Sequence, residues 1–179
     1  MHEPMQWPKE TIINSKYEFH EFQAGMNLLV YGHPDVSQAK MILERLQELG
    51  VNSVAITFPF HQDHWQADQV YINAMETPDF SEIEQLILLA KAENLAVMLR
   101  PIMDEKKLMA QGKWRGEIAP RSPKKWFRSY YDLLWPYAEL AQKTGVEVFN
   151  VGTEFNSMEK YGDEWINLIQ DLRRVYHGK

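Results

Sequence analysis

Residues 147–156, EVFNVGTEFN, place a carboxylate directly after a run of mostly apolar residues. Side chains alternate along an extended strand, so Asn150, Gly152 and Glu154 share one face of this run. In that position Glu154 is either a solvated loop residue or a group with a chemical role. The other apolar runs of the chain end in a similar way, which favours the chemical role.

Tyr31, His61 and Arg100 lie at or close to the ends of the other three apolar runs. In all four runs one face is bulky and apolar, and the opposite face is small or polar. The bulky faces consist of Met26, Leu28 and Val30, of Val54, Ile56 and Phe58, of Val97 and Leu99, and of Phe149 and Val151. A sheet covered on both sides would be apolar on both faces, so the pattern favours a barrel whose strand ends share one mouth.

The polar and aromatic groups near this mouth each have two interpretations. Arg100 is suited to holding an ionised carboxylate or a sugar hydroxyl, and equally to an ion pair that seals the mouth. Trp65, Trp114 and Tyr31 are suited to stacking on sugar rings, although aromatic residues serve cores as often. Asn150 faces inward below the carboxylate, where it orients that group or bonds the backbone.

The segment HQDH contains three residues of metal-ligand type, His61, Asp63 and His64. A closed metal site needs further ligands, and no other cluster is placed to supply them. We therefore interpret this segment as a solvated or substrate-contacting turn and expect no metal. The segment YGHPD matches neither glycine-rich phosphate motif, so no cofactor is expected.

Four apolar runs alternate with four amphipathic stretches along the chain. The runs are 25–32, 53–60, 96–102 and 147–153, and the expected helices lie at 37–49, within 77–94, at 123–143 and at 163–176. This alternation predicts an α/β fold with a parallel sheet. The loops 61–78 and 103–122 are long, and the functional loops of such folds follow the carboxyl ends of the strands.

The helix boundaries carry their own signals. Ser37 is the expected N-cap of the first helix, and Asp79 or Thr77 that of the second. The third helix is expected to bend at Pro136 and to end at Gly145. One face of the first helix has helical spacing of apolar residues, namely Met41, Ile42, Leu46 and Leu49.

The composition is typical of one globular domain, with 179 residues and a formal net charge of −6. Residues 25–179 are expected to form that domain. Residues 1–24 form an N-terminal extension in which KYEFHEF is a short strand or a lid. The chain contains no cysteine, which excludes disulfides and thiol chemistry.

Neither a nucleic acid nor a membrane is expected as a partner of this chain. The densest basic cluster is interpreted as a solvated helix start and consists of Arg121, Lys124, Lys125 and Arg128. No apolar run is long enough to cross a membrane, and no secretory signal is visible. A cytoplasmic location is therefore expected, with secretion as the alternative.

Several segments in order resemble the glycoside hydrolase family 113 β-mannanases. They are LGVNSVAITFPFHQD, LAVMLRPIMD, KWRGEI, KKWFRSYYDLLWPYAELAQKTGVEVFNVGTEF and WINLIQDLRRVYHGK, and the likeness extends over residues 25–179. The family consists of (β/α)8 barrels from a large clan of retaining glycosidases. The resemblance implies that Glu154 is the general acid/base and that Arg100 and Trp114 lie in segments lining the substrate cleft.

The chain departs from the family in offering four strands and four helices, about half of a TIM (β/α)8 barrel. The family nucleophile, a glutamate at the end of the seventh strand, has no counterpart. Asp104 and Glu117 are the other carboxylates near the third strand end, and neither matches the family position. The resemblance therefore implies half of an active site, through a fragment, an association of two half-barrels or a loss of catalysis.

Three hypotheses follow from these observations. The first is a retaining glycoside hydrolase acting on mannan-type oligo- or polysaccharides. The second is a non-catalytic carbohydrate-binding half-barrel, and open sheet edges predict association in both cases, as a homodimer or with a missing C-terminal half-barrel. The third is an unrelated α/β enzyme using Arg100 for an anionic substrate, which the acidic balance and the missing phosphate loop disfavour.

Overall fold

The computed structural model of the chain describes residues 22–179 and contains one parallel four-stranded sheet. Its strands follow the chain in the order β1 (Gly25–Leu29), β2 (Ser53–Phe60), β3 (Ala96–Met103) and β4 (Val148–Phe149). The register aligns Thr57 with Arg100 and Leu99 with Phe149. The expected parallel α/β fold is confirmed, and it forms four strands of a barrel wall.

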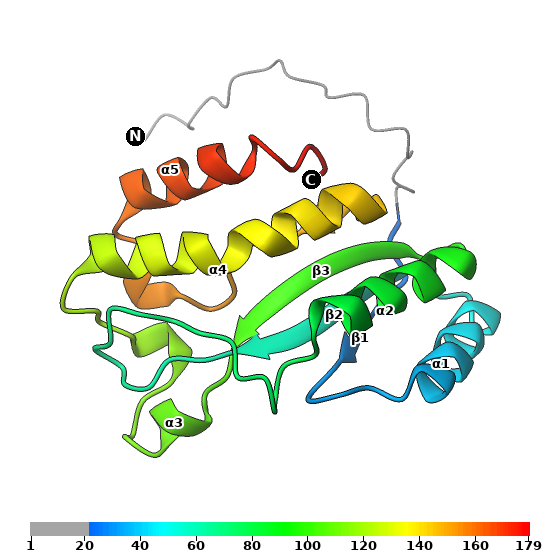
Figure 1. Ribbon diagram of the computed structural model, residues 1–179, viewed down its shortest axis with the longest axis horizontal. Helices are drawn as coiled ribbons and strands as arrows, with labels where there is room; N and C mark the ends of the chain where they lie inside the picture. The colour runs from blue at the N-terminus through cyan, green and yellow to red at the C-terminus, as the bar shows by residue number, and fades with distance from the viewer. Residues whose placement is uncertain (1–21) are drawn as a thin grey trace, which may run out of the picture.

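The four long helices lie along one side of this sheet, and the short α3 (Lys106–Met109) lies beyond the carboxyl ends of the strands (Figure 1). The long helices are α1 (Val36–Glu48), α2 (Phe80–Ala92), α4 (Pro123–Thr144) and α5 (Gly162–Leu172). The four long helices contact one another in chain order, α1 with α2, α2 with α4, and α4 with α5. Short turns of 3₁₀ helix at Arg115–Glu117 and Asn156–Met158 lie in the loops after β3 and β4.

The first helix begins one residue earlier than predicted, and its N-cap is Asp35 rather than Ser37. The Asp35 carboxylate accepts hydrogen bonds from the backbone N–H groups of Ser37 and Gln38, at 2.8 and 3.0 Å. The residues that α1 buries are Ala39 and Leu43, and of the apolar residues with helical spacing only Leu46 packs against the core. Three members of the predicted face, Met41, Ile42 and Leu49, are exposed. Among the described residues α1 has a neighbouring helix on one side only, which explains the exposure.

The second and third helices follow the predicted signals more closely. Asp79 caps α2 in a reciprocal capping box with Glu82. The helix α4 continues through Pro136 and ends at Gly145, whose φ of 68° is the left-handed value that glycine tolerates. The last helix is shorter than predicted and ends at Leu172.

The fourth strand is much shorter than the apolar run that predicted it. Only Val148 and Phe149 pair as a strand with β3. The Asn150 N–H still bonds the Leu99 carbonyl at 2.9 Å, and beyond it the chain turns away from the ladder. On the other edge of β4, Lys179 donates to the Glu147 carbonyl and accepts from the Phe149 N–H, both at 2.9 Å. This is the bonding pattern of a parallel neighbour.

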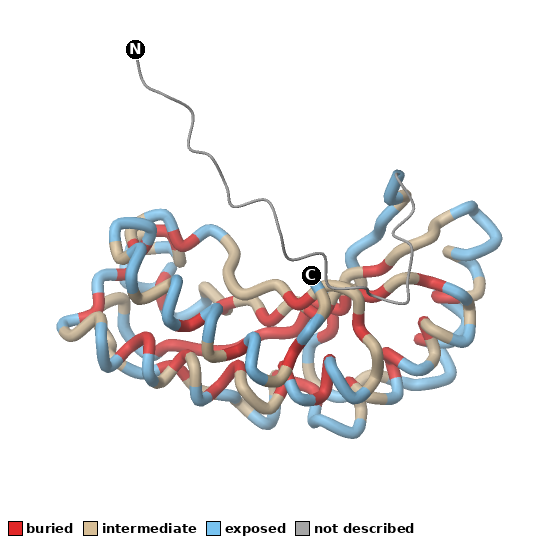
Figure 2. The backbone as a smooth tube through the Cα atoms, turned by 90° about the horizontal axis from the view of Figure 1, so that it is seen from above, coloured by how far each residue is buried: buried red, intermediate tan, exposed pale blue. Residues whose placement is uncertain are grey.

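The core lies between the sheet and the helices. Val54, Ile56, Phe58, Val97 and Leu99 are buried there, as the bulky faces predicted, whereas Met26 on the edge strand β1 is 51% exposed. Figure 2 shows the buried residues as a central band with exposed residues around it. Aromatic rings dominate the helix side of the band, where Phe58 packs on Tyr137 and Phe60 on Tyr130.

The opposite face of the sheet is the inner, concave face of the half-barrel. No described helix covers it, and Ser53, Ala55, Met98 and Arg100 stay partly exposed. A recess of about 230 Å³ lies on this face and is lined by residues of all four strands. No helix among residues 22–179 is long and apolar enough to span a membrane. The predicted strand or lid in KYEFHEF lies outside the described residues except for Phe22.

Candidate functional site

The carboxyl ends of the strands form a polar mouth above the inner face, and Arg100 crosses it. The Arg100 Nε atom donates to Thr153 Oγ1 at 3.3 Å, and Nη1 donates to Asn27 Oδ1 at 3.4 Å. Because Asn27 is on β1 and Thr153 follows β4, one side chain spans the full width of the sheet. Both bonds are long and go to neutral groups, so the guanidinium keeps donor capacity for a further acceptor.

Asn150 supports the turn that carries the candidate carboxylate. Its Oδ1 accepts from the Gly152 N–H at 3.2 Å and from Thr153 Oγ1 at 3.1 Å. These bonds fix the backbone before Glu154 and do not reach its side chain. Gly152 allows close packing here, because a Cβ atom on it would lie 3.3 Å from the rings of Phe155 and Trp165.

Glu154 lies in a backbone conformation that is rare for its residue type. Its φ is 59°, in the left-handed region, which costs about 1 kcal/mol or more for a non-glycine residue. Its side chain is 55% exposed, and Oε2 lies 3.3 Å from Nε of Arg115. A half-exposed carboxylate at a strand end, held by one cation, is accessible to a ligand in the mouth.

Arg115 and Glu105 were not among the residues that the sequence singled out. The Glu105 Oε1 atom accepts from both the backbone N–H and the Nε of Arg115, at 3.0 and 2.9 Å. Arg115 Nη1 donates to the Met103 carbonyl at 3.0 Å. The motif KWRGEI contains Arg115 and was the available signal, but nothing in its spacing indicated a contact with Glu154.

A second polar cluster occupies the ends of β1, β2 and β3. The Tyr31 hydroxyl donates to Asp104 Oδ2 at 3.3 Å. Burial, followed by the neighbouring Asp104 carboxylate, raises the pKa of Tyr31 above its ordinary value. The positive charge of Arg115, which also pairs with Glu154, acts on the pKa of Tyr31 in the opposite direction.

His61 lies beneath this cluster rather than in the open mouth. It is only 3% exposed, with Nε2 at 3.4 Å from Glu76 Oε2 and Nδ1 at 3.9 Å from Asp104 Oδ1. Burial lowers the pKa of His61, and the carboxylates of Asp104 and Glu76 oppose that shift in part. The predicted direct contact of His61 with a sugar does not agree with this burial, because its ring is covered.

The two tryptophans predicted for stacking differ in their surroundings. Trp114 is partly exposed, and its ring lies so close to Gly116 that a Cβ atom there would come within 2.3 Å of it. Trp65 packs against the core, with Lys113 Nζ at 5.4 Å from its ring centroid and His64 stacked on it at 5.9 Å. Trp114 is therefore accessible for stacking, whereas the ring contacts of Trp65 are with protein groups.

The turn HQDH distributes its side chains to three different environments. Gln62 is buried and accepts from Trp126 Nε1 at 2.7 Å. Asp63 bonds Lys107 and the Tyr71 hydroxyl, and both bonds lower the pKa of Asp63. His64 is exposed. Within residues 22–179, no group of three or more histidines and carboxylates could hold a metal ion.

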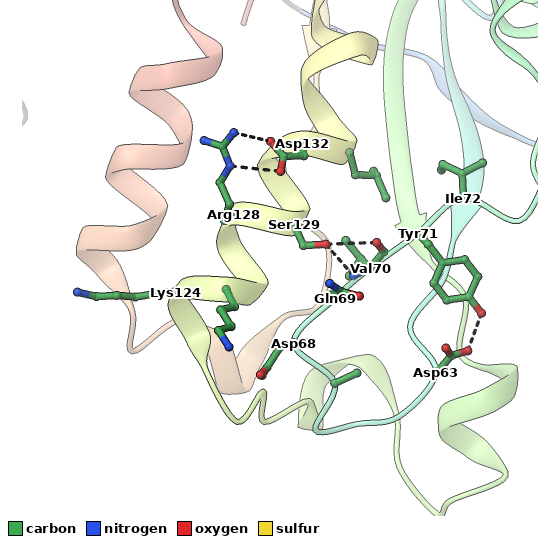
Figure 3. A pocket seen from close by; sticks show the side chains of 13 residues that line it. Asp63, Asp68, Gln69, Val70, Tyr71, Ile72, Lys124, Arg128, Ser129 and Asp132 are labelled. Atoms are coloured by element: carbon green, nitrogen blue, oxygen red, sulfur yellow. Dashed lines mark hydrogen bonds and ion pairs between the residues drawn. The ribbon is translucent and has the colours of Figure 1, made fainter.

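A larger cavity of about 960 Å³ lies between the loop after β2 and the first half of α4 (Figure 3). Many of its polar groups are bonded to one another. Arg128 pairs with Asp132 at 3.0 Å, and the Ser129 hydroxyl bonds both backbone groups of Val70. The bonds of Ser129 fasten the loop to α4, so we assign this cavity a structural role and take the mouth as the candidate site.

Comparison with known proteins agrees with this geometry. The model of Glycoside Hydrolase Family 113 matches residues 29–179. A GH113 β-mannanase from Alicyclobacillus acidocaldarius, solved in complex with ManMIm, is 29% identical over 88% of this chain, with a TM-score of 0.79. A GH113 β-1,4-mannanase solved as a complex is 26% identical over 89%, with a TM-score of 0.78. This chain spans 52% and 54% of those two chains, about half their length. None of the curated proteins compared with the chain matches it.

Proposed function

The chain belongs to glycoside hydrolase family 113, and we propose that it carries the acid/base half of a retaining β-mannan-hydrolysing site. Glu154 is the proposed general acid/base. The observation that carries this proposal is a half-exposed carboxylate at the end of β4, held by Arg115 in the polar mouth. The name of the similar A. acidocaldarius protein, a β-mannanase, supports mannan as the substrate class.

The chemistry assigns Glu154 two successive tasks. In a retaining reaction one carboxyl group protonates the leaving oxygen while a second carboxylate attacks the anomeric carbon. A covalent glycosyl–enzyme intermediate forms, and the first carboxylate then removes a proton from the incoming water. The exposure of Glu154 suits a group that must reach both the leaving oxygen and a water molecule.

The remaining mouth residues are proposed to bind the sugar chain. Arg100 offers guanidinium donors to sugar hydroxyls or to the second carboxylate, and Tyr31 with Asp104 offers a hydroxyl and a carboxylate side by side. Trp114 offers an exposed aromatic surface for stacking. Asn150 acts on the backbone of the Glu154 turn rather than on the substrate.

The second catalytic carboxylate is proposed to come from a part of the barrel beyond the four described strands. Glu105 is close to Glu154, but both carboxylates contact the same Nε of Arg115, so the guanidinium fills the space between them. A retaining pair needs about 5–5.5 Å between its carboxyl groups with the sugar between them. The parallel pairing of Lys179 with β4 supports a neighbouring strand at this edge, contributed by further barrel segments or by a partner.

A carbohydrate-binding role without catalysis is the second candidate. The hydrogen bonds from Arg115 to Glu105 favour this binding role, because within the described half-barrel they hold the Glu105 carboxylate away from action as a nucleophile. In this alternative the mouth binds mannan through Arg100, Tyr31 and Trp114. Association with another half-barrel, as a homodimer or otherwise, is then a separate property to be measured.

The test is hydrolysis of β-mannan and of an aryl β-mannoside by the purified chain, beside Glu154→Gln. Turnover that the substitution abolishes supports catalysis, and light scattering then identifies the oligomer that completes the site. Mannohexaose binding without turnover supports the binding role. If the folded chain shows neither turnover nor mannohexaose binding, both candidates are refuted.

A further inference from the structure

The backbone of Glu154 alone does not determine where its carboxylate points. The residue has a left-handed φ of 59°, and its side chain is 55% exposed. A glutamate has three side-chain torsions, and an exposed one samples several rotamers unless a contact selects one. Within residues 22–179, the ion pair of Glu154 is with Arg115, at 3.3 Å.

Arg115 is itself held by groups that do not depend on Glu154. The Glu105 carboxylate bonds the backbone N–H and the Nε of Arg115, and the Met103 carbonyl bonds its Nη1. The Arg115 side chain is 15% exposed, far less than that of Glu154. Met103 is the last residue of β3 and Glu105 lies two residues after it, so the guanidinium is fixed to the barrel wall.

We propose that Glu105 and Arg115 are positioning residues that hold the Glu154 carboxylate in one orientation facing the mouth. The Nε atom of Arg115 is shared between the two carboxylates, at 2.9 Å from Glu105 and 3.3 Å from Glu154. Glu105 balances the charge of the guanidinium, so Arg115 orients Glu154 without presenting a full unpaired cation to it. The catalytic meaning of this arrangement rests on the proposed function, but the orientation itself does not.

The arrangement also connects two loops that the chain places far apart. Arg115 follows β3, whereas Glu154 follows β4, and the short 3₁₀ turns of these loops contact each other. The Ser157 hydroxyl bonds the Ile118 carbonyl in the same region. The contact of Arg115 with Glu154 therefore lies within a joined pair of loops, which is what reproducible placement of a reactive group requires.

The experiment measures the side-chain rotamers of Glu154 by three-bond couplings in protein carrying ¹³C- and ¹⁵N-labelled glutamate. We expect one dominant rotamer in the parent chain and averaged couplings in Arg115→Met. Arg115→Lys retains the positive charge but loses the guanidinium group, and we expect couplings between those of the parent and those of Arg115→Met. Glu105→Gln keeps Arg115 but weakens the bonds that hold it, and we expect averaged Glu154 couplings in this variant as well.

The matched control is Arg128→Met, which removes an exposed arginine–carboxylate pair on α4 outside the mouth. It should leave the Glu154 couplings unchanged, and circular dichroism melting should show that all variants are folded. If Arg115→Met and Glu105→Gln retain the parent couplings, the proposal is overturned. The same holds if Arg128→Met averages them equally.

Turnover, where the chain shows it, adds a second readout. Arg115→Met should lower kcat/KM about tenfold or more on mannan, whose leaving group needs a proton, and far less on a dinitrophenyl mannoside. Equal losses on both substrates would contradict an action through Glu154. If Glu154→Gln leaves mannan binding and turnover unaffected, the proposed function fails, and the rotamer measurement still decides the positioning claim.

Discussion

The two faces of the sheet differ in how deeply their side chains are buried within the described residues. On the helix side, Ile56, Phe58 and Leu99 are fully buried under α2 and α4. On the inner side, Ala55, Met98 and Arg100 remain partly exposed above a small recess. Both faces are built from the same strands, since side chains alternate. The helix face therefore holds the core, whereas the side chains of the inner face are only partly buried within the described residues.

This difference separates stability from function in the molecule. The helix face buries large apolar and aromatic side chains, which is the main favourable contribution to folding. The inner face and its mouth contain Arg100, Glu154 and Arg115, whose polar atoms contribute little to burial. Substitutions on the two faces should therefore have opposite signatures, with large losses of stability on one and large losses of binding on the other.

The largest effect is expected for Trp126→Ala on the helix face. Trp126 is fully buried and donates to Gln62 Oε1 at 2.7 Å. Its removal creates a cavity and leaves a buried amide oxygen without its donor, so we expect a loss of about 3–5 kcal/mol in the free energy of unfolding. Urea denaturation measures it. Met98→Ala on the inner face is the matched truncation, and a comparable loss there would contradict the contrast.

An intermediate effect is expected for Arg100→Met on the inner face. Arg100 makes two long bonds to neutral groups and is only partly buried, so the unfolding free energy should change by less than about 1 kcal/mol. Mannohexaose affinity should fall about tenfold or more, because charged donors to hydroxyls are lost. Calorimetric titration measures the affinity. Unchanged binding with a large loss of stability would assign Arg100 to the fold instead.

The smallest effect is expected for the pH dependence that His61 contributes. Burial lowers the pKa of His61 in the folded chain, with opposing contributions from Asp104, Glu76 and Asp63 and a further lowering by Lys107. The unfolded chain therefore binds the proton more readily, so His61 should reduce stability as pH falls below about 6.5. Between about pH 7 and 5, the unfolding free energy of His61→Gln should fall by less than that of the parent, with a difference below about 1 kcal/mol. Urea denaturation at several pH values measures this. The same pH dependence in both proteins would argue against a lowered pKa of His61.

The alternation of the strands was predictable because it depends on neighbouring residues in the chain. Val54, Ile56 and Phe58 are buried, and Ala55 is not, as the spacing indicated. The cap at Asp79 and the stop at Gly145 were likewise local signals that the structure confirms. The helical pattern of α1 showed which apolar residues share a face but did not show what packs against it, and Met41, Ile42 and Leu49 are exposed.

The sequence by itself determined the parallel half-barrel, its family and the place of Glu154 in the loop after the fourth apolar run, because periodicity and motif order are properties of the chain. Only the tertiary structure decided that Arg115 and Glu105 contact Glu154 and that His61 is buried beneath Asp104. These contacts join loops after different strands. Their geometry depends on how long loops fold over the mouth, and no residue spacing within one segment encodes it.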